Sequence, residues 1–120
     1  MNGIEQLTLV PALPRGEAIA RLNDDLRKRG RGGMIVVTRG VRNIVGFDVR
    51  ALLAALAVYD AFDADNDPHG ERDFGDLAIG SEELLWKIDY YDKRFEFGSS
   101  DPVDPTTTSR VLTVMLASEY

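Results

Sequence analysis

The segment DLAIGSEELLWKIDYY, residues 76–91, shows the plainest structural pattern in the chain. Leu84, Trp86, Ile88 and Tyr90 alternate with Leu85, Lys87, Asp89 and Tyr91, and all members of the first set are apolar or aromatic, as expected for a β-strand with one buried face. Residues 80–83 are typical of a turn, and residues 76–79 precede them as a shorter strand. The segment therefore predicts an antiparallel hairpin whose core-facing side chains are Leu84, Trp86, Ile88 and Tyr90.

Upstream of the hairpin, a helix is predicted over residues 15–29. Ile19, Leu22 and Leu26 recur at three- and four-residue spacing, which places them on one face of a helix. Gly30 follows at the position where glycine commonly ends a helix in the left-handed conformation. Residues 34–38 are apolar and β-branched, so they predict a short buried strand.

Two more helices are expected. The second covers residues 49–62 and begins after Asp48; because nearly every residue in 49–59 is apolar, we expect it to be central and buried on all sides. The third begins at Pro105, after Asp104, and its buried face is formed by Val111, Leu112, Met115 and Leu116. Phe95 and Phe97 are expected to start a further short strand.

These elements predict an α+β fold. Three helices pack on a small three- to four-stranded antiparallel sheet, in the order helix-strand-helix-hairpin-helix. Residues 15–120 form a single domain, and residues 1–14 form a flexible arm interrupted by prolines. No apolar run approaches the roughly 20 residues that cross a bilayer, and no signal peptide is evident. We therefore expect a cytoplasmic protein without membrane contact.

The charge of the chain is unevenly distributed. The 120 residues carry a net charge of −6 and include no cysteine, which excludes disulfides, thiolate metal sites and thiol chemistry. Residues 15–50 carry a net charge of +5, whereas residues 51–120 carry −10. The overall acidity argues against a nucleic-acid binder, but that argument is weaker for the basic segment.

Residues 60–76 hold seven carboxylates, one arginine and the only histidine of the chain. We predict that this segment contacts a partner. Its candidate residues are Asp60, Asp63, Asp65, Asp67, His69, Glu71, Asp73 and Asp76. A solvated acidic turn without a ligand fits the same composition, because exposed carboxylates about 6 Å apart repel by only ~0.7 kcal/mol in water.

A bound cation is a further interpretation of this segment. Counted from Asp65, acids fall at positions 1, 3, 9 and 12 of a calcium loop, with Gly70 at position 6. However, His69 stands where an oxygen ligand is wanted, and the aspartate at position 12 is short for a bidentate ligand. Alternatively, Asp67, His69, Glu71 and Asp73 would share one side of an extended segment and hold a divalent metal for a hydrolase or nuclease.

Two clusters outside this segment carry charge. Arg27, Lys28, Arg29 and Arg31 form a basic patch that suits phosphates or an acidic partner, although no aromatic residue interleaves with it. The same residues also suit the end of a helix, where cations interact favourably with the dipole. Lys87 and Asp89 share the outer face of the predicted strand, where they either pair across strands or join His69 and Asp73 in a site if the loop folds back.

Five segments carry a resemblance to a known family. IARLNDDLRKRGRGG (19–33), IVVTRGV (35–41), YDAFDADNDPHGERDFGDL (59–77), LLWKIDYYD (84–92) and RVLTVMLASEY (110–120) resemble a family of small bacterial proteins of unknown function. The resemblance implies a setting on plasmids and integrative elements, near antirestriction and plasmid-maintenance genes. It implies no activity and no site residues.

We therefore predict an accessory binding protein of a mobile element rather than an enzyme, since no complete catalytic set is present. Its most concrete form is an inhibitor of a host defence system, of the anti-CRISPR or antirestriction type. The acidic segment would contact a basic surface of a host nucleic-acid-binding protein or complex. The alternatives are the metal-dependent hydrolase or nuclease and a nucleic-acid binder using the basic patch. No cofactor is expected unless residues 63–76 bind a divalent cation.

Overall fold

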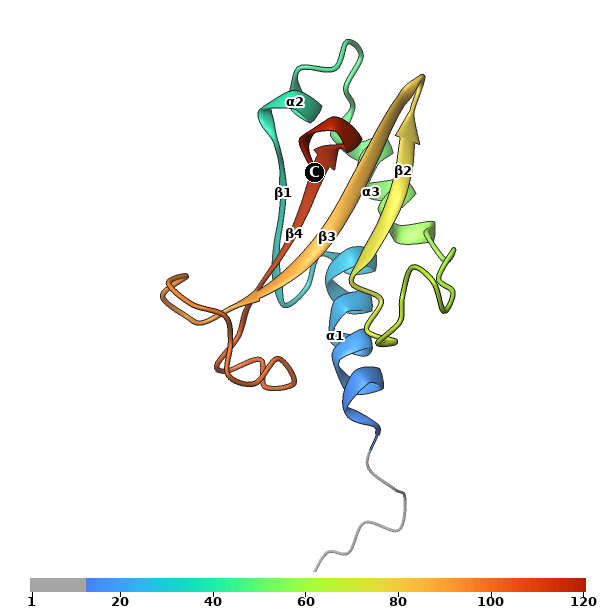
Figure 1. Cartoon of the computed structure of the whole chain (residues 1–120). Helices are drawn as coiled ribbons and strands as arrows, with labels where there is room; N and C mark the ends of the chain where they lie inside the picture. Colours follow the sequence, from blue (N-terminus) through green and yellow to red (C-terminus); the bar gives the residue numbers. More distant parts are fainter. Residues whose placement is uncertain (1–12) are drawn as a thin grey trace, which may run out of the picture.

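The computed structural model describes residues 13–120, which form two layers (Figure 1). One layer is a four-stranded sheet in the order β1-β4-β3-β2. Its strands are β1 (Gly33–Val37), β2 (Phe74–Ile79), β3 (Glu82–Tyr91) and β4 (Ser109–Leu116). Helices α1 (Arg15–Arg29) and α3 (Val49–Val58) cover one face of this sheet. The predicted α+β class is confirmed.

The sheet is mixed, so the prediction of a purely antiparallel sheet is wrong. Strands β2, β3 and β4 are antiparallel neighbours, but β1 pairs with β4 in parallel. The parallel pair needs a glycine, because a Cβ on Gly33 would lie 2.3 Å from the carbonyl oxygen of Arg110. β1 is thus held to the sheet through β4 alone.

The last predicted helix is a strand, β4. Asp104, expected to cap a helix, instead forms a local turn in which its Oδ1 accepts the backbone N–H of Thr106 at 2.9 Å. The apolar run that follows lies between β1 and β3, and Leu112 and Val114 are fully buried there. A short apolar run of this kind can form either a helix or a strand. Here it is a strand because it pairs with β1 on one side and with β3 on the other.

Helix α3 is shorter and less buried than predicted. It ends at Val58, and only Leu52 and Leu56 are buried, whereas Val49 and Leu53 are 56% and 41% exposed. The prediction of burial on all sides is wrong because α3 contacts its neighbours along one face only. The Asp48 cap is confirmed, since its side chain accepts the N–H of Arg50 at 2.9 Å.

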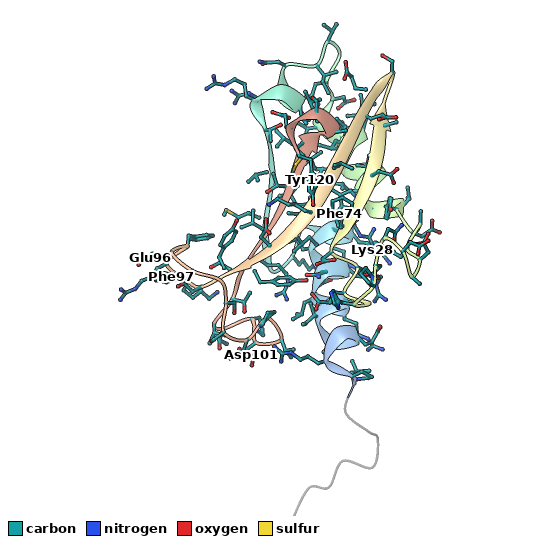
Figure 2. The ribbon with its side chains drawn as sticks, in the orientation of Figure 1. Lys28, Phe74, Glu96, Phe97, Asp101 and Tyr120 are labelled. Atoms are coloured by element: carbon teal, nitrogen blue, oxygen red, sulfur yellow. The ribbon has the colours of Figure 1, made fainter. Side chains whose placement is uncertain are left out.

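The core lies between the helices and the inner face of the sheet. Leu26, Leu52 and Leu56 from the helices meet the predicted inward residues of β3, of which Leu84, Trp86 and Ile88 are buried. The hairpin turn is shorter than predicted and consists of Gly80 and Ser81. Neither α1 nor α3 covers the outer face of the sheet. The C-terminal 3₁₀ helix η1 (Ala117–Glu119) contacts β3, and the rings of Phe74 and Tyr120 pack on the outer face 5.8 Å apart (Figure 2).

The remaining predictions have mixed outcomes. α1 has the predicted bounds, and Gly30 ends it with a left-handed φ of 68°. A short helix, α2 (Arg39–Arg42), was not expected; its first turn is capped by the side chain of Thr38. Phe95 and Phe97 are exposed in the β3–β4 connection and start no strand. Residues 1–12 of the predicted arm lie outside the described residues.

Candidate functional site

The acidic loop, defined here as residues 60–76, leaves α3 and enters β2 through tight turns. Asp63 Oδ1 accepts the backbone N–H groups of Asp65 and Asn66, each at 2.9 Å. Asp67 Oδ1 accepts the N–H of Arg72 at 3.0 Å. Backbone groups held by side chains in this way give the loop a defined shape. The segment is therefore not the extended stretch on which the His69-centred interpretation depends.

The same geometry bears on cation binding. Within residues 13–120, no three histidine, aspartate or glutamate side chains are grouped closely enough to hold a metal ion. One carboxylate oxygen of Asp63 and one of Asp67 accept loop N–H groups, and one oxygen of Glu71 accepts the hydroxyl of Tyr90. The described residues thus offer no assembled calcium loop and no assembled divalent-metal centre.

Arg72, the only cation in the acidic loop, is bonded outside it. Its guanidinium contacts Asp24 of α1 at 2.8 Å and Glu17 at 3.3 Å. The hydrogen bond to Asp24 raises the pKa of Arg72 above its ordinary value. Its backbone is left-handed, with φ of 52°, a conformation that costs a side-chain-bearing residue about 1–2 kcal/mol. Arg72 therefore fastens the loop to α1 and does not neutralise the loop's own acids.

None of the seven carboxylates of the acidic loop forms an ion pair among the described residues, and four of them are exposed, namely Asp60, Asp63, Asp65 and Asp76. We call Asp60, Asp63 and Asp65 the acidic tip; all three are exposed, and none forms an ion pair within the part of the chain that the structure describes. Among the other predicted residues, His69 and Asp76 are exposed and Asp67 is half-buried. The acidic tip therefore holds three of the four exposed carboxylates of the predicted site, and the fourth, Asp76, lies apart from them in β2.

Glu71 belongs instead to a polar network between α1 and the sheet. Arg110 Nε donates to Asn23 Oδ1 at 2.7 Å, and Asn23 Nδ2 donates to the hydroxyl of Tyr90 at 2.8 Å. That hydroxyl donates to Glu71 Oε1, also at 2.8 Å. Asn23 and Arg110 are almost fully buried, so the network ties the loop to both layers of the fold.

Burial shifts the pKa of two groups in and beside the network. Burial raises the pKa of the Tyr90 hydroxyl far above its ordinary value, so Tyr90 stays protonated and is a poor base or nucleophile. Burial raises the pKa of Asp73, and the negative charge of the nearby Glu71 raises it further. Sequence reasoning missed Asn23, Tyr90 and Arg110 as a set, although a polar Asn23 within the apolar stripe of α1 was a signal of a buried hydrogen bond.

The predicted basic patch is divided by the structure. Arg27 is 2% exposed and donates to the carbonyl oxygens of Leu56 and Tyr59 at 2.7 and 2.9 Å. Its guanidinium also lies over the rings of Phe62 and Trp86. Arg29 pairs with Asp25 at 3.1 Å, which leaves Lys28 and Arg31 exposed without an ion pair among the described residues. Arg27 is a core residue and does not contribute to a binding surface.

Lys87 and Asp89 form an ion pair within one strand, β3, and not across strands as predicted. Their charged groups pair with each other at 2.8 Å on the outer face of the sheet. The hydrogen bond to Asp89 raises the pKa of Lys87 above its ordinary value. This pair occupies the outer face of β3 and does not join a site with His69.

A known family model matches most of the chain. A family model described as "Protein of unknown function (DUF3768)" matches residues 37–119. The chain belongs to the DUF3768 family. The matched span includes the acidic loop and strands β2, β3 and β4, whereas α1 and the basic patch precede it. Neither the curated proteins nor the solved structures contain a match to the DUF3768 protein. No helix in residues 13–120 has the length and apolar character needed to cross a membrane.

Loss of the Arg72 guanidinium should loosen the acidic loop without unfolding the protein. For Arg72→Ala we expect the free energy of unfolding to fall by about 1–2 kcal/mol, because the partly buried bonds to Asp24 and Glu17 are lost. Hydrogen exchange at the loop amides should become faster, while exchange in β3 and β4 should keep its pattern. Alanine keeps the Cβ and its backbone strain, so this variant isolates the guanidinium; Arg72→Gly is the comparison that also relieves the strain, and it should cost less stability while loop exchange still becomes faster. Unchanged loop exchange in both variants would contradict the fastening role.

Proposed function

We propose that this DUF3768 protein is a binding protein that docks its acidic tip on a basic surface of a macromolecular partner. The observation that supports the proposal most is the placement of Arg72, whose side chain is bonded to α1 and leaves Asp60, Asp63 and Asp65 without a cation. Unpaired exposed carboxylates on one loop produce a local negative potential, which attracts and orients a basic partner.

The acidic tip is presented in an ordered way. The loop backbone is held by the side chains of Asp63, Asn66 and Asp67, and the loop as a whole is fastened through Arg72. A surface that is ordered before binding loses less conformational entropy when the complex forms. The tip is therefore suited to a rigid docking contact with a basic groove.

The most concrete partner is the nucleic-acid-binding surface of a host defence complex. Such surfaces are rich in lysine and arginine, because they neutralise phosphates. A row of carboxylates on a small protein can occupy such a surface in place of nucleic acid. This version of the proposal takes its biological setting, a mobile element countering restriction or CRISPR, from the family resemblance alone.

The proposal is tested by the triple substitution Asp60→Asn, Asp63→Asn and Asp65→Asn. Asparagine keeps a hydrogen-bond acceptor for the loop amides but removes the charge. The readout is the plating efficiency of unmodified phage on hosts with an active restriction or CRISPR system. Wild-type protein should raise it, and the triple variant should return it to the level of an empty vector. Three contacts of up to about 1 kcal/mol each would weaken a complex by about a hundredfold.

A matched control removes three charges elsewhere. Glu82, Glu83 and Glu96 are exposed and form no ion pair in the described part of the chain, so their glutamine variants should keep full protection. Denaturation curves of both triple variants should match the wild type. Protection that survives neutralisation of the acidic tip would overturn the docking role, and absence of protection by the wild-type protein would overturn the defence-inhibitor version.

A further inference from the structure

One edge of the sheet is open for pairing. The N–H of Thr38 donates to the carbonyl of Val114 in β4 at 3.0 Å. Because successive strand residues direct their backbone groups to opposite sides, the N–H and C=O groups of Ile35 and Val37 point away from β4. β1 is the outermost strand on this side, and these groups have no hydrogen-bond partner within residues 13–120.

This edge lacks the features that protect sheet edges from pairing. Natural edge strands are usually interrupted by charges, prolines or bulges. The sequence of β1, GMIVV, contains none of these, and Met34 and Val36 are 48% and 38% exposed. The opposite edge, β2, carries the exposed Asp76 near its centre. Only one of the two edges is therefore protected by a charge within the strand.

An apolar groove runs beside the open edge. It has a volume of about 360 Å³ and lies between β1 and α3. Its walls are formed by Gly30, Ile35, Val37, Phe47, Val49, Leu52 and Leu53. The exposed surfaces of Val49 and Leu53, unexpected for a helix predicted to be buried, form one wall. A strand added to β1 would place alternate side chains in this groove, as in recognition by strand addition.

The surroundings of the groove are basic. A second hollow of about 200 Å³ shares Gly30, Ile35 and Leu53 with it and is lined by the exposed Lys28 and Arg29, as well as by Arg27, whose buried guanidinium is bonded inside the core. No acidic residue lines either hollow. Lys28, at the C-terminal end of α1 (Figure 2), is exposed, as are Arg31 before β1 and Arg50 at the start of α3. None of these three forms an ion pair among the described residues.

We infer that the β1 edge and its groove form a docking site for an extended acidic segment of a partner protein, which joins the sheet as an additional strand. The free backbone groups of Ile35 and Val37 would pair with that strand, the groove would take its alternate apolar side chains, and the cations would meet its acidic ends. This site is separate from the acidic tip, and it does not depend on the function proposed for the tip.

Other occupants fit these observations less well. A second copy paired through β1 would bring two sets of unpaired cations together, which is electrostatically unfavourable. Single-stranded nucleic acid binds through stacking on aromatic residues, and Phe47 is the one aromatic residue lining the groove. Backbone groups along a strand edge are better matched by another polypeptide backbone.

The probe for this site is a fluorescent peptide of alternating valine and threonine with a pair of glutamates at each end. Fluorescence anisotropy with the full chain should show saturable binding that weakens with salt. Val37→Pro removes an N–H that the β4 ladder does not use, so the fold should persist while peptide binding falls by about tenfold or more. Ala78→Pro places proline at the free β2 edge, where the register likewise directs the N–H away from the sheet, and should leave binding unchanged.

Reversing the charge of two of these cations provides a second, independent test. Lys28→Glu combined with Arg31→Glu should weaken binding of the glutamate-ended peptide and create binding of the same peptide with lysine ends. This variant keeps the proposal testable even if Val37→Pro fails to fold. Three results would overturn the proposal: no binding of the acidic peptide at low salt, tighter binding of an oligothymidylate at the same groove, or a concentration-dependent dimer that Val37→Pro abolishes.

Discussion

Replacing Arg27 by methionine is expected to lower the free energy of unfolding by about 3–5 kcal/mol. The guanidinium is buried and donates to the carbonyl oxygens of Leu56 and Tyr59 at the end of α3. Methionine fills much of the volume but donates no hydrogen bond, so the carbonyl of Tyr59 loses the guanidinium and that of Leu56 keeps only the N–H of Tyr59 at 3.3 Å. Urea denaturation followed by circular dichroism measures the change.

The neighbouring residue is the control for this prediction. Lys28 is exposed and forms no ion pair within residues 13–120, so Lys28→Met should change stability by no more than about 0.5 kcal/mol. The two variants remove the same charge from adjacent positions of one helix. Equal effects on stability would show that the hydrogen bonds from Arg27 to the carbonyl groups of Leu56 and Tyr59 do not stabilise the protein.

Adding a single methyl group at Gly75 is expected to destabilise the protein by about 3 kcal/mol, the upper end of the usual cost of overpacking. A Cβ at this position would lie 2.6 Å from Trp86 Nε1 and 2.6 Å from the ring of Tyr59. Both rings are buried and pack edge-to-face with centroids 5.4 Å apart, so neither can move aside freely. Thermal denaturation of Gly75→Ala tests this prediction.

Gly98→Ala is the matched control for Gly75→Ala. Its nearest neighbour to an added Cβ is the carbonyl oxygen of Tyr90 at 3.8 Å, an ordinary contact, so we expect a change of no more than about 0.5 kcal/mol. Combining Gly75→Ala with Tyr59→Leu should cost less than the sum of the two single changes, because the smaller side chain makes room for the methyl group. Additive costs would mean that Gly75 and Tyr59 do not compete for space.

Short sequence patterns correctly predicted those features that can be recognised from a few consecutive residues. The alternation along β3 identified its buried residues, and the cation-rich end of α1 followed by Gly30 identified where that helix stops. Asp48 identified the start of α3. The two helix ends depend on contacts between residues close in sequence, and the face of β3 follows from the two-residue period of a strand, so both signals are legible before the distant segments meet.

The acidic loop shows where such patterns are insufficient. Its composition predicted a charged surface, and the tip is exposed as expected. The alternation from Asp67 to Asp73 suggested a shared side, but the loop turns because its own carboxylates accept backbone N–H groups. Arg72 lies among the acids in sequence, yet its partners are on α1, 48 and 55 residues away. Pairing across such distances is not visible in the local pattern.

The sequence alone determined the separation of charge along this chain, the hairpin and the helix ends, because these follow from composition and from contacts between near neighbours. Tertiary structure alone decided that residues 109–116 are a strand, since only the partners β1 and β3 distinguish it from a helix with the same apolar residues. It also decided that Arg27 is buried while Lys28 is exposed. In both cases the physical reason is the same: burial and strand pairing depend on which distant segments meet when the chain is packed.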